Sequence, residues 1–186
     1  MVKVYAEENH NMELTALKTV WRSALVRRWH ANPDLTHTTD YLLGHGGRVV
    51  LILHHLMPNV SRNVILAALF HDLGEIATGD VPEITKNEHP DLAKMLKNIE
   101  RSKRLDIGVE IHISEGEKRL IKFADRIDAF FWAQHHAPRL LKRTDWMGAR
   151  LWINAEAVHL GVVTQQRSEW NANVPAKFPT NSGDEE

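Results

Sequence analysis

The stretch that decides the fold reads ILAALFHDLGEIATGD and runs from Ile65 to Asp80. Six apolar residues lead up to a histidine and an aspartate that stand side by side, His71 and Asp72. On an α-helix, His71, Asp72 and Glu75 lie within about 100° of one another and share one face. Burying three such ionisable groups costs on the order of several kcal/mol without compensation, and for a histidine with carboxylates the usual compensation is a divalent cation. The stretch therefore predicts one wall of a metal site.

The composition excludes several classes of partner. The 186 residues carry a formal net charge of −1 and include no cysteine, so a metal must be held by nitrogen and oxygen ligands. The sequence contains no long run of like charges, so its charge pattern does not indicate a nucleic-acid partner. The apolar run 65–70 falls far short of the roughly 20 residues that span a bilayer, so we expect no membrane partner. The start MVKVYAEENH has no apolar signal-peptide core, which favours an intracellular protein.

Apolar residues recur at helical spacing along almost the whole chain, and strand-like alternation is nearly absent. The pattern predicts an all-α fold, a compact bundle of about six main helices in a single domain over 1–170, followed by a polar, flexible tail over 171–186. Ser61 is the expected N-cap of the third helix, and Ser114 with Glu117 forms a capping box for the fifth. The expected helices cover 11–29, 40–57, 61–77, 90–105, 114–136 and 144–166, with a loop over 78–89.

The second expected helix contains three glycines, Gly44, Gly46 and Gly47. Each costs up to about 1 kcal/mol against alanine in a helix, so something other than helix propensity keeps them there. We interpret them as a sign that a ligand or another helix approaches His45 closely. His37, in the preceding segment, competes with His45 as the histidine that joins the His-Asp doublet.

A cation needs more ligands than two adjacent side chains provide. Asp125 lies among apolar neighbours in the fifth expected helix, and metal sites in helical bundles are built from residues on facing helices. The plausible ligand set is therefore His45, His71, Asp72 and Asp125.

This ordered set, a histidine, a His-Asp doublet and a distant aspartate, resembles the HD-domain metal-dependent phosphohydrolases. The wider match HDLGEIATGDVP, residues 71–82, looks like the branch that hydrolyses deoxynucleotides, including the bacterial 5'-deoxynucleotidases. Arg28-Trp29 matches an Arg-Trp pair that this branch places at its nucleotide pocket, and RWHANPDL, residues 28–35, resembles the small phage dATP triphosphohydrolases. The resemblance covers about 24–133. The family often writes its first histidine as Glu-His-Ser, where this chain has glycine on both sides of His45.

The resemblance implies an HD-domain bundle in which the ligand set holds a divalent transition metal, Mn²⁺, Co²⁺, Zn²⁺, Fe²⁺ or Ni²⁺. Glu75 is expected to accept the proton of the attacking water or to hold a second ion, with Asp80 assisting either role. Trp29 offers a flat face to a base or sugar. Charge on the phosphoryl oxygens requires cations, for which the candidates are Arg28, Lys86, Lys122 and Arg126. Arg28 has a second interpretation, as a cap at the end of the helix expected over 11–29.

The leading hypothesis is a triphosphohydrolase that cleaves dATP to deoxyadenosine and triphosphate and so depletes dATP during synthesis of phage 2-aminoadenine DNA. The alternatives are a 5'-deoxynucleotidase that removes the phosphate of a dNMP and a non-catalytic, metal-stabilised helical binding protein. Because a triphosphate carries more charge than a monophosphate, the leading hypothesis predicts that several of the four candidate cations converge on one point.

The resemblance also favours a cytoplasmic protein, located in the host cytoplasm if phage-encoded. We further expect a homo-oligomer, because Trp146, Trp152 and Trp170 exceed what one small core requires.

Overall fold

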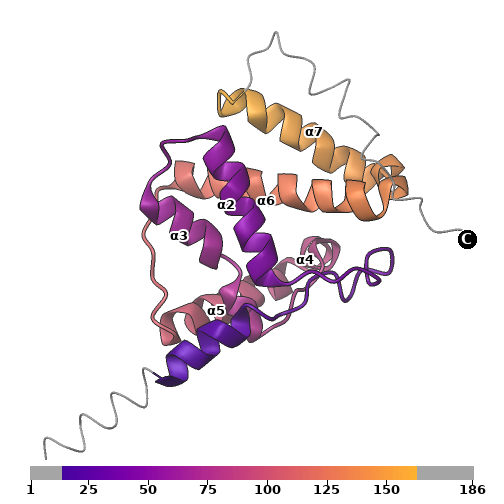
Figure 1. Cartoon of the computed structure of the whole chain (residues 1–186). Coiled ribbons are helices and arrows are strands. Elements are labelled where there is room, and N and C mark those ends of the chain that lie inside the picture. Colours follow the sequence, from indigo (N-terminus) through magenta and orange to yellow (C-terminus); the bar gives the residue numbers. More distant parts are fainter. Residues whose placement is uncertain (1–13, 163–186) are drawn as a thin grey trace, which may run out of the picture. The chain divides into compact units, whose positions relative to one another are not determined.

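The computed structural model describes residues 14–162, and every regular element in this part of the chain is a helix (Figure 1). The expectation of an all-α fold is therefore confirmed. A first helix covers 14–23 within the described residues. The elements that follow are α2 (Leu42–Leu56), α3 (Arg62–Phe70), the 3-10 helix η1 (Leu73–Ile76), α4 (Glu83–Glu88), α5 (Pro90–Asp106), α6 (Glu115–His136), the 3-10 helix η2 (Pro138–Lys142) and α7 (Thr144–His159).

The chain divides into two compact units, Met1–Asp128 and Ala129–Glu186. The boundary falls inside α6, so the first part of this helix belongs with α2 to α5. All the predicted metal-binding, catalytic and substrate-binding residues lie in the first unit. A single domain over 1–170 stays a prediction, and the tail expected over 171–186 lies outside the described residues.

The core of the first unit forms where α2 packs against α3 and where the first part of α6 contributes Phe123 and Ile127. The buried residues of α2 recur at intervals of three and four, as expected for a helix with one apolar side. They are Leu42, His45, Gly46, Val49 and Leu53. His45 is the ionisable member of this row, so the packing that buries the apolar side of α2 also carries an imidazole into the interior.

Two glycines permit close contacts between backbones in the first unit. A Cβ on Gly46 would lie 2.9 Å from the carbonyl oxygen of Leu69 in α3, which agrees with the expected close approach of a second helix near His45. A Cβ on Gly74 would collide with the backbone of Glu100, where α5 packs against η1. Both contacts lie next to the His-Asp doublet.

The first helix is shorter than expected, because it ends at 23 instead of 29. Beyond it the chain pairs with a later segment: the Arg28 N–H donates to the carbonyl of Asp40 at 2.9 Å, and Arg27 forms an isolated antiparallel bridge with Tyr41. These bonds replace the helical ones. Arg28 and Trp29 therefore lie in a loop, and the interpretation of Arg28 as a helix cap is wrong.

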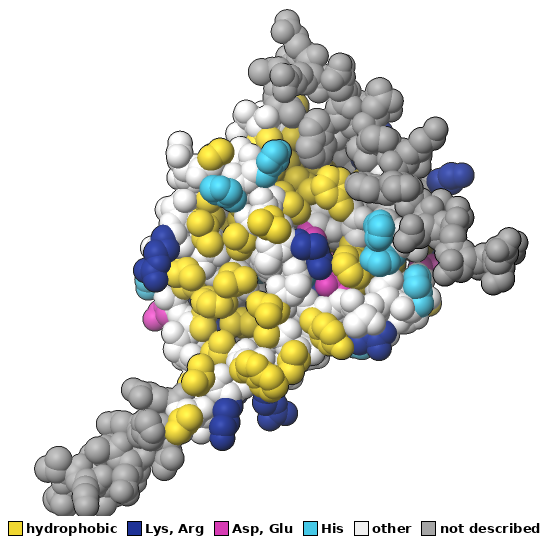
Figure 2. Space-filling model, in the orientation of Figure 1, with side chains coloured by type: hydrophobic (Ala, Val, Ile, Leu, Met, Phe, Trp, Pro, Cys, Tyr) yellow, Lys and Arg dark blue, Asp and Glu magenta, His cyan; other side chains and the backbone are white. Residues whose placement is uncertain are grey.

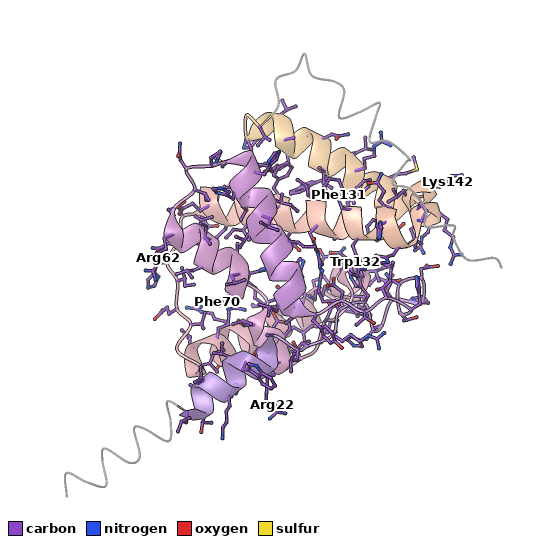
Figure 3. The ribbon with its side chains drawn as sticks, viewed as in Figure 1. Arg22, Arg62, Phe70, Phe131, Trp132 and Lys142 are labelled. Atoms are coloured by element: carbon purple, nitrogen blue, oxygen red, sulfur yellow. The ribbon has the colours of Figure 1, made fainter. Side chains whose placement is uncertain are left out.

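The third helix is also shorter than expected. Ser61 is its N-cap, as predicted, and its side chain accepts a hydrogen bond from the N–H of Val64 at 3.3 Å. The helix ends at Phe70, which Figure 3 labels, and not at 77. Asp72 leaves the helical conformation with φ −100° and ψ 2°, and η1 follows. The doublet thus marks the junction of two helices and does not lie within one.

The bounds of the remaining helices agree with the expected ones in some places and differ in others. Helix α5 has nearly the expected bounds, and α6 begins with the predicted capping box, in which the N–H of Ser114 donates to Glu117 at 2.7 Å. The expected loop over 78–89 contains α4, and η2 was not predicted. Helix α7 ends at His159 and not at 166. A glycine in the left-handed conformation, Gly161 with φ 67°, follows this end, as is common after helices.

Within 14–162, no helix combines the length and the apolar character needed to cross a membrane. Hydrophobic side chains gather on the face of the first unit that carries α2 and the helix at 14–23 (Figure 2). Leu17 and Trp21 of that helix and Leu51 of α2 are exposed. Trp146 and Trp152 are half-buried in α7, and Trp170 lies outside the described residues. The homo-oligomer stays a prediction.

Candidate active site

The structure brings the four predicted metal ligands together inside the first unit. His45 comes from α2, His71 follows the last residue of α3, Asp72 precedes η1, and Asp125 comes from α6. The Nε2 atoms of His45 and His71 are 3.3 Å apart, and Nε2 of His71 lies 3.1 Å from Oδ2 of Asp72. Nε2 of His45 lies 3.2 Å from Oδ1 of Asp125 and 3.5 Å from Oδ2 of Asp72. His37, the competing candidate, is exposed in the loop before α2.

These separations fit a divalent ion. Ligand atoms placed about 2.1 Å from an ion lie about 3.0 Å apart at right angles and about 3.4 Å apart at tetrahedral angles. The facing atoms of the cluster are 3.1 to 3.5 Å apart. His45, His71 and Asp72 form the compact group, with ligand atoms all within 4.8 Å of one another, and Asp125 adds an oxygen beside His45. Two imidazole nitrogens with carboxylate oxygens suit a transition metal.

A hydrogen bond at Nδ1 orients each of the two imidazoles, His45 and His71. Nδ1 of His71 lies 2.7 Å from the carbonyl oxygen of Ala68, which can only accept a hydrogen bond. Nδ1 of His45 lies 2.7 Å from Oδ2 of Asp128. In both rings Nδ1 is therefore the donor, and Nε2 faces the cluster.

The electrostatics of the cluster favour a positive charge at its centre. Burial lowers the pKa of His45, but hydrogen bonds with Asp125, Asp128 and Asp72 outweigh it and raise this pKa to about 10. Burial raises the pKa of Asp72, yet the charge of His71 and hydrogen bonds with both histidines hold it well below its usual value. Without an ion, a proton on the His45 imidazole supplies positive charge. A divalent cation that takes its place would release this proton.

Glu75 lies in η1, three residues after Asp72, and is buried. Burial, followed by the charges of Asp72 and Asp80, raises the pKa of Glu75 to about 9. Its Oε1 lies 3.9 Å from Nζ of Lys86, while its buried Oε2 has no hydrogen-bond partner among the described residues. Glu75 is thus a buried carboxyl with a raised pKa and an unpaired oxygen, near the cluster of predicted metal ligands. Such a group is suited to exchange a proton with a ligand.

Asp80 forms a hydrogen bond with the Arg-Trp pair. Its Oδ2 accepts a hydrogen bond of 2.8 Å from the backbone N–H of Trp29. Trp29 has φ 62°, a left-handed conformation that is rare for a bulky side chain and strained. The bond to Asp80 helps to hold this conformation.

Arg28 and Trp29 form a second corner of the site. The Arg28 guanidinium lies 5.0 Å from the centre of the Trp29 ring, within the range of a cation–π contact. Nη1 of Arg28 pairs with Oδ2 of Asp40 at 3.2 Å and lies 3.5 Å from Oδ2 of Asp128, the carboxylate that contacts His45. Two carboxylates therefore connect the Arg-Trp corner to the metal cluster.

Three of the four candidate cations are held in ion pairs. Arg28 pairs with Asp40 and Asp128, Lys86 with Glu75, and Arg126 with Glu83 at 3.7 Å. Lys122 is exposed on α6. Each ion pair lowers the positive charge that the residue can offer to a phosphate.

Three site residues were missed by the sequence reasoning: Asp40, Arg48 and Asp128. A signal for two of them is present, because Arg48 and Asp128 each follow a predicted ligand by three residues on the same helix and so share its face. Asp40 carries no such signal, since it is brought to the site by the loop before α2.

A model of the family described as "YfbR-like: 5'-deoxynucleotidase YfbR-like" matches residues 11–111. A 5'-deoxynucleotidase of Yersinia pestis (strain Pestoides F) is 28% identical over 133 residues, which take in 59% of this chain and 66% of the relative. A 5'-deoxynucleotidase of Yersinia pseudotuberculosis (serotype O:3, strain YPIII) gives the same values. The match thus spans about 66% of the length of these curated relatives.

These findings overturn the leading hypothesis of a dATP triphosphohydrolase. The matching family and both relatives are described as 5'-deoxynucleotidases, which was the first alternative.

Proposed function

The chain belongs to the YfbR-like family, and on this premise we propose that it is a metal-dependent 5'-deoxynucleotidase, which removes the phosphate from deoxynucleoside monophosphates. The observation that supports this most directly is the compact group of His45, His71 and Asp72, beside which Asp125 places a carboxylate oxygen 3.2 Å from Nε2 of His45. We propose the cytoplasm, where nucleotide pools are found, as its location.

In this proposal His45, His71, Asp72 and Asp125 hold one divalent transition metal ion. A bound ion of this kind polarises a phosphoryl oxygen and lowers the pKa of water toward neutrality. The four side chains come from three segments of the chain and are oriented before any ligand arrives, so little rearrangement is needed.

Glu75 is the proposed general base. It takes a proton from the water whose oxygen attacks phosphorus, and it returns a proton to the O5' oxygen as the phosphorus–oxygen bond breaks. Its raised pKa describes the cluster without an ion, and a cation nearby favours the ionised form that a base needs. A second ion beside Glu75 and Asp80 remains the alternative role for these carboxylates.

The substrate is held from two sides in this proposal. Lys86, on α4, is the cation closest to Glu75 and is the proposed partner of the phosphate. Trp29 presents its ring to the base or the sugar, with Arg28 fixing the ring from the other side. Lys122 and Arg126 flank Asp125 on α6 and are proposed as outer contacts of the phosphate.

Purified protein supplied with Co²⁺ or Mn²⁺ should be assayed against a panel of dNMPs, NMPs and dNTPs, with orthophosphate and triphosphate separated. The expected result is orthophosphate release from dNMPs, lost on chelation and in an Asp72→Ala variant. An exposed acidic residue of the same unit, changed in Glu115→Gln, serves as the control and should behave as the wild type.

Two results would contradict the proposal. Release of triphosphate from dNTPs would assign a different reaction to the same cluster. Binding of the metal ion without turnover of any nucleotide would favour the non-catalytic helical binding protein.

A further inference from the structure

An ion-pair bridge, formed by Asp40, the half-buried Arg48 and Asp128, lies behind the metal cluster. Both carboxylates are almost fully buried. Nη2 of Arg48 donates to both oxygens of Asp40, at 3.0 and 2.9 Å, while its Nε donates to Oδ1 of Asp128 at 2.6 Å and its Nη2 to Oδ2 at 3.1 Å. One guanidinium thus holds two carboxylates in fixed positions, a geometry for which arginine is suited and lysine is not.

Asp128 uses its second oxygen on the metal cluster. Oδ2 lies 2.7 Å from Nδ1 of His45, and a carboxylate can only accept in this hydrogen bond. A hydrogen of the ring is therefore fixed on Nδ1, and Nε2 faces His71 and Asp125. Because Arg48 grips the same carboxylate, Asp128 cannot rotate away from the ring.

We propose that Asp128 and Arg48 are positioning residues, which hold the His45 imidazole in the tautomer and orientation that present Nε2 to a divalent cation. This rests on the metal site of the proposed function. Removal of a carboxylate behind a ligating histidine typically weakens metal binding about 10- to 100-fold, because the ring loses both its orientation and part of its basicity.

Asp40 forms the end of the bridge away from His45, and only a side chain that reaches both Asp40 and Asp128, as Arg48 does, can connect them. Asp40 also accepts hydrogen bonds from Nη1 of Arg28 at 3.2 Å and from the indole Nε1 of Trp29 at 3.3 Å. The bridge therefore ties the orientation of His45 to the Arg-Trp corner, so that the two halves of the site are built on one network.

The test is a Co²⁺ titration of the full chain, followed by the visible absorption of the bound ion, for Asp128→Ala, Asp128→Asn and Arg48→Met. Asp128→Ala should bind Co²⁺ about 10- to 100-fold more weakly than the wild type, with an altered spectrum. Asp128→Asn should recover part of this loss, since its amide oxygen can still accept from Nδ1. Arg48→Met, which keeps the side-chain stem, should lose about tenfold.

A matched control is Asp145→Asn, which removes the carboxylate of an exposed pair with Arg143 at 2.9 Å. It should leave the Co²⁺ affinity unchanged. Circular dichroism establishes which variants are folded, and if Asp128→Ala does not fold, the comparison passes to Asp128→Asn and Arg48→Met. Folded variants with wild-type affinity and spectrum would overturn the positioning role alone, whereas a wild type that binds no Co²⁺ would overturn the proposed metal site and this inference together.

Discussion

Replacing Gly46 by alanine should force α2 and α3 apart beside the metal cluster. The new Cβ would lie 2.9 Å from the carbonyl oxygen of Leu69, where ordinary contacts begin near 3.4 Å, so the two backbones must separate by about half an ångström. Such overpacking costs about 1–3 kcal/mol, against a gain of about 1 kcal/mol from alanine within a helix. At Gly47, one residue on, a Cβ meets nothing within 4 Å, so only the gain applies.

Urea unfolding of Gly46→Ala and Gly47→Ala, followed by circular dichroism, measures the two free energies of unfolding. Gly47→Ala should be more stable than the wild type by up to about 1 kcal/mol, and Gly46→Ala should lie about 1–3 kcal/mol below Gly47→Ala. Gly46→Ala should also bind Co²⁺ more weakly, because His45 precedes the substituted residue and Leu69 is close to His71 in the chain. Equal stabilisation by the two alanines would refute the close approach of α2 and α3.

Four further outcomes are expected. Glu75→Gln should lower the rate of phosphate release about 10²- to 10⁴-fold while Co²⁺ affinity stays near that of the wild type, and undiminished turnover would exclude Glu75 as the proton acceptor. Trp29→Ala should raise KM for a dNMP about tenfold or more with kcat little changed, whereas Trp29→Phe should retain most of the affinity; a change confined to kcat would argue against stacking. In chelated protein, the pKa of Glu75 is raised to about 9, so its contribution to the free energy of unfolding is complete below about pH 4.5 and is lost as the pH rises toward 9. Thermal unfolding of Glu75→Gln should therefore depend less on pH than that of the wild type. Identical pH profiles for the two proteins would contradict the raised pKa. Free Co²⁺ at about 100 times its Kd should stabilise the wild type by about 2.7 kcal/mol, and a melting temperature indifferent to the ion would count against a native metal site.

Features of the fold that depend on local sequence could be predicted. The capping box at Ser114 and Glu117 is a local signal, and α6 begins where it indicates. The early end of α3 has no such signal. It coincides with the packing of α5 against η1, where the backbone of Glu100 reaches Gly74, a contact between residues distant in sequence.

The candidate site divides in the same way. The doublet His71-Asp72, with His45 and Asp125, was predicted from motif and spacing, and the structure brings these four side chains together. The position of Trp29 depends on the return of the chain from Asp40 and on the hydrogen bond to Asp80, neither of which a local pattern reveals. The ion pairs of Arg28, Lys86 and Arg126 are likewise a tertiary property. The triphosphate hypothesis was wrong because the matching family and relatives are 5'-deoxynucleotidases, a distinction that the short stretch RWHANPDL did not carry.

The wide sequence separation of the ligands has a consequence for the order of folding events. His45 and Asp125 are 80 residues apart, and closing a flexible loop of that length costs about 4 kcal/mol of chain entropy. An unfolded chain therefore presents at most a local pair such as His71-Asp72, and high-affinity ion uptake must wait until α2, η1 and α6 have met. Spectral capture of Co²⁺ during refolding would then time the completion of this long-range assembly.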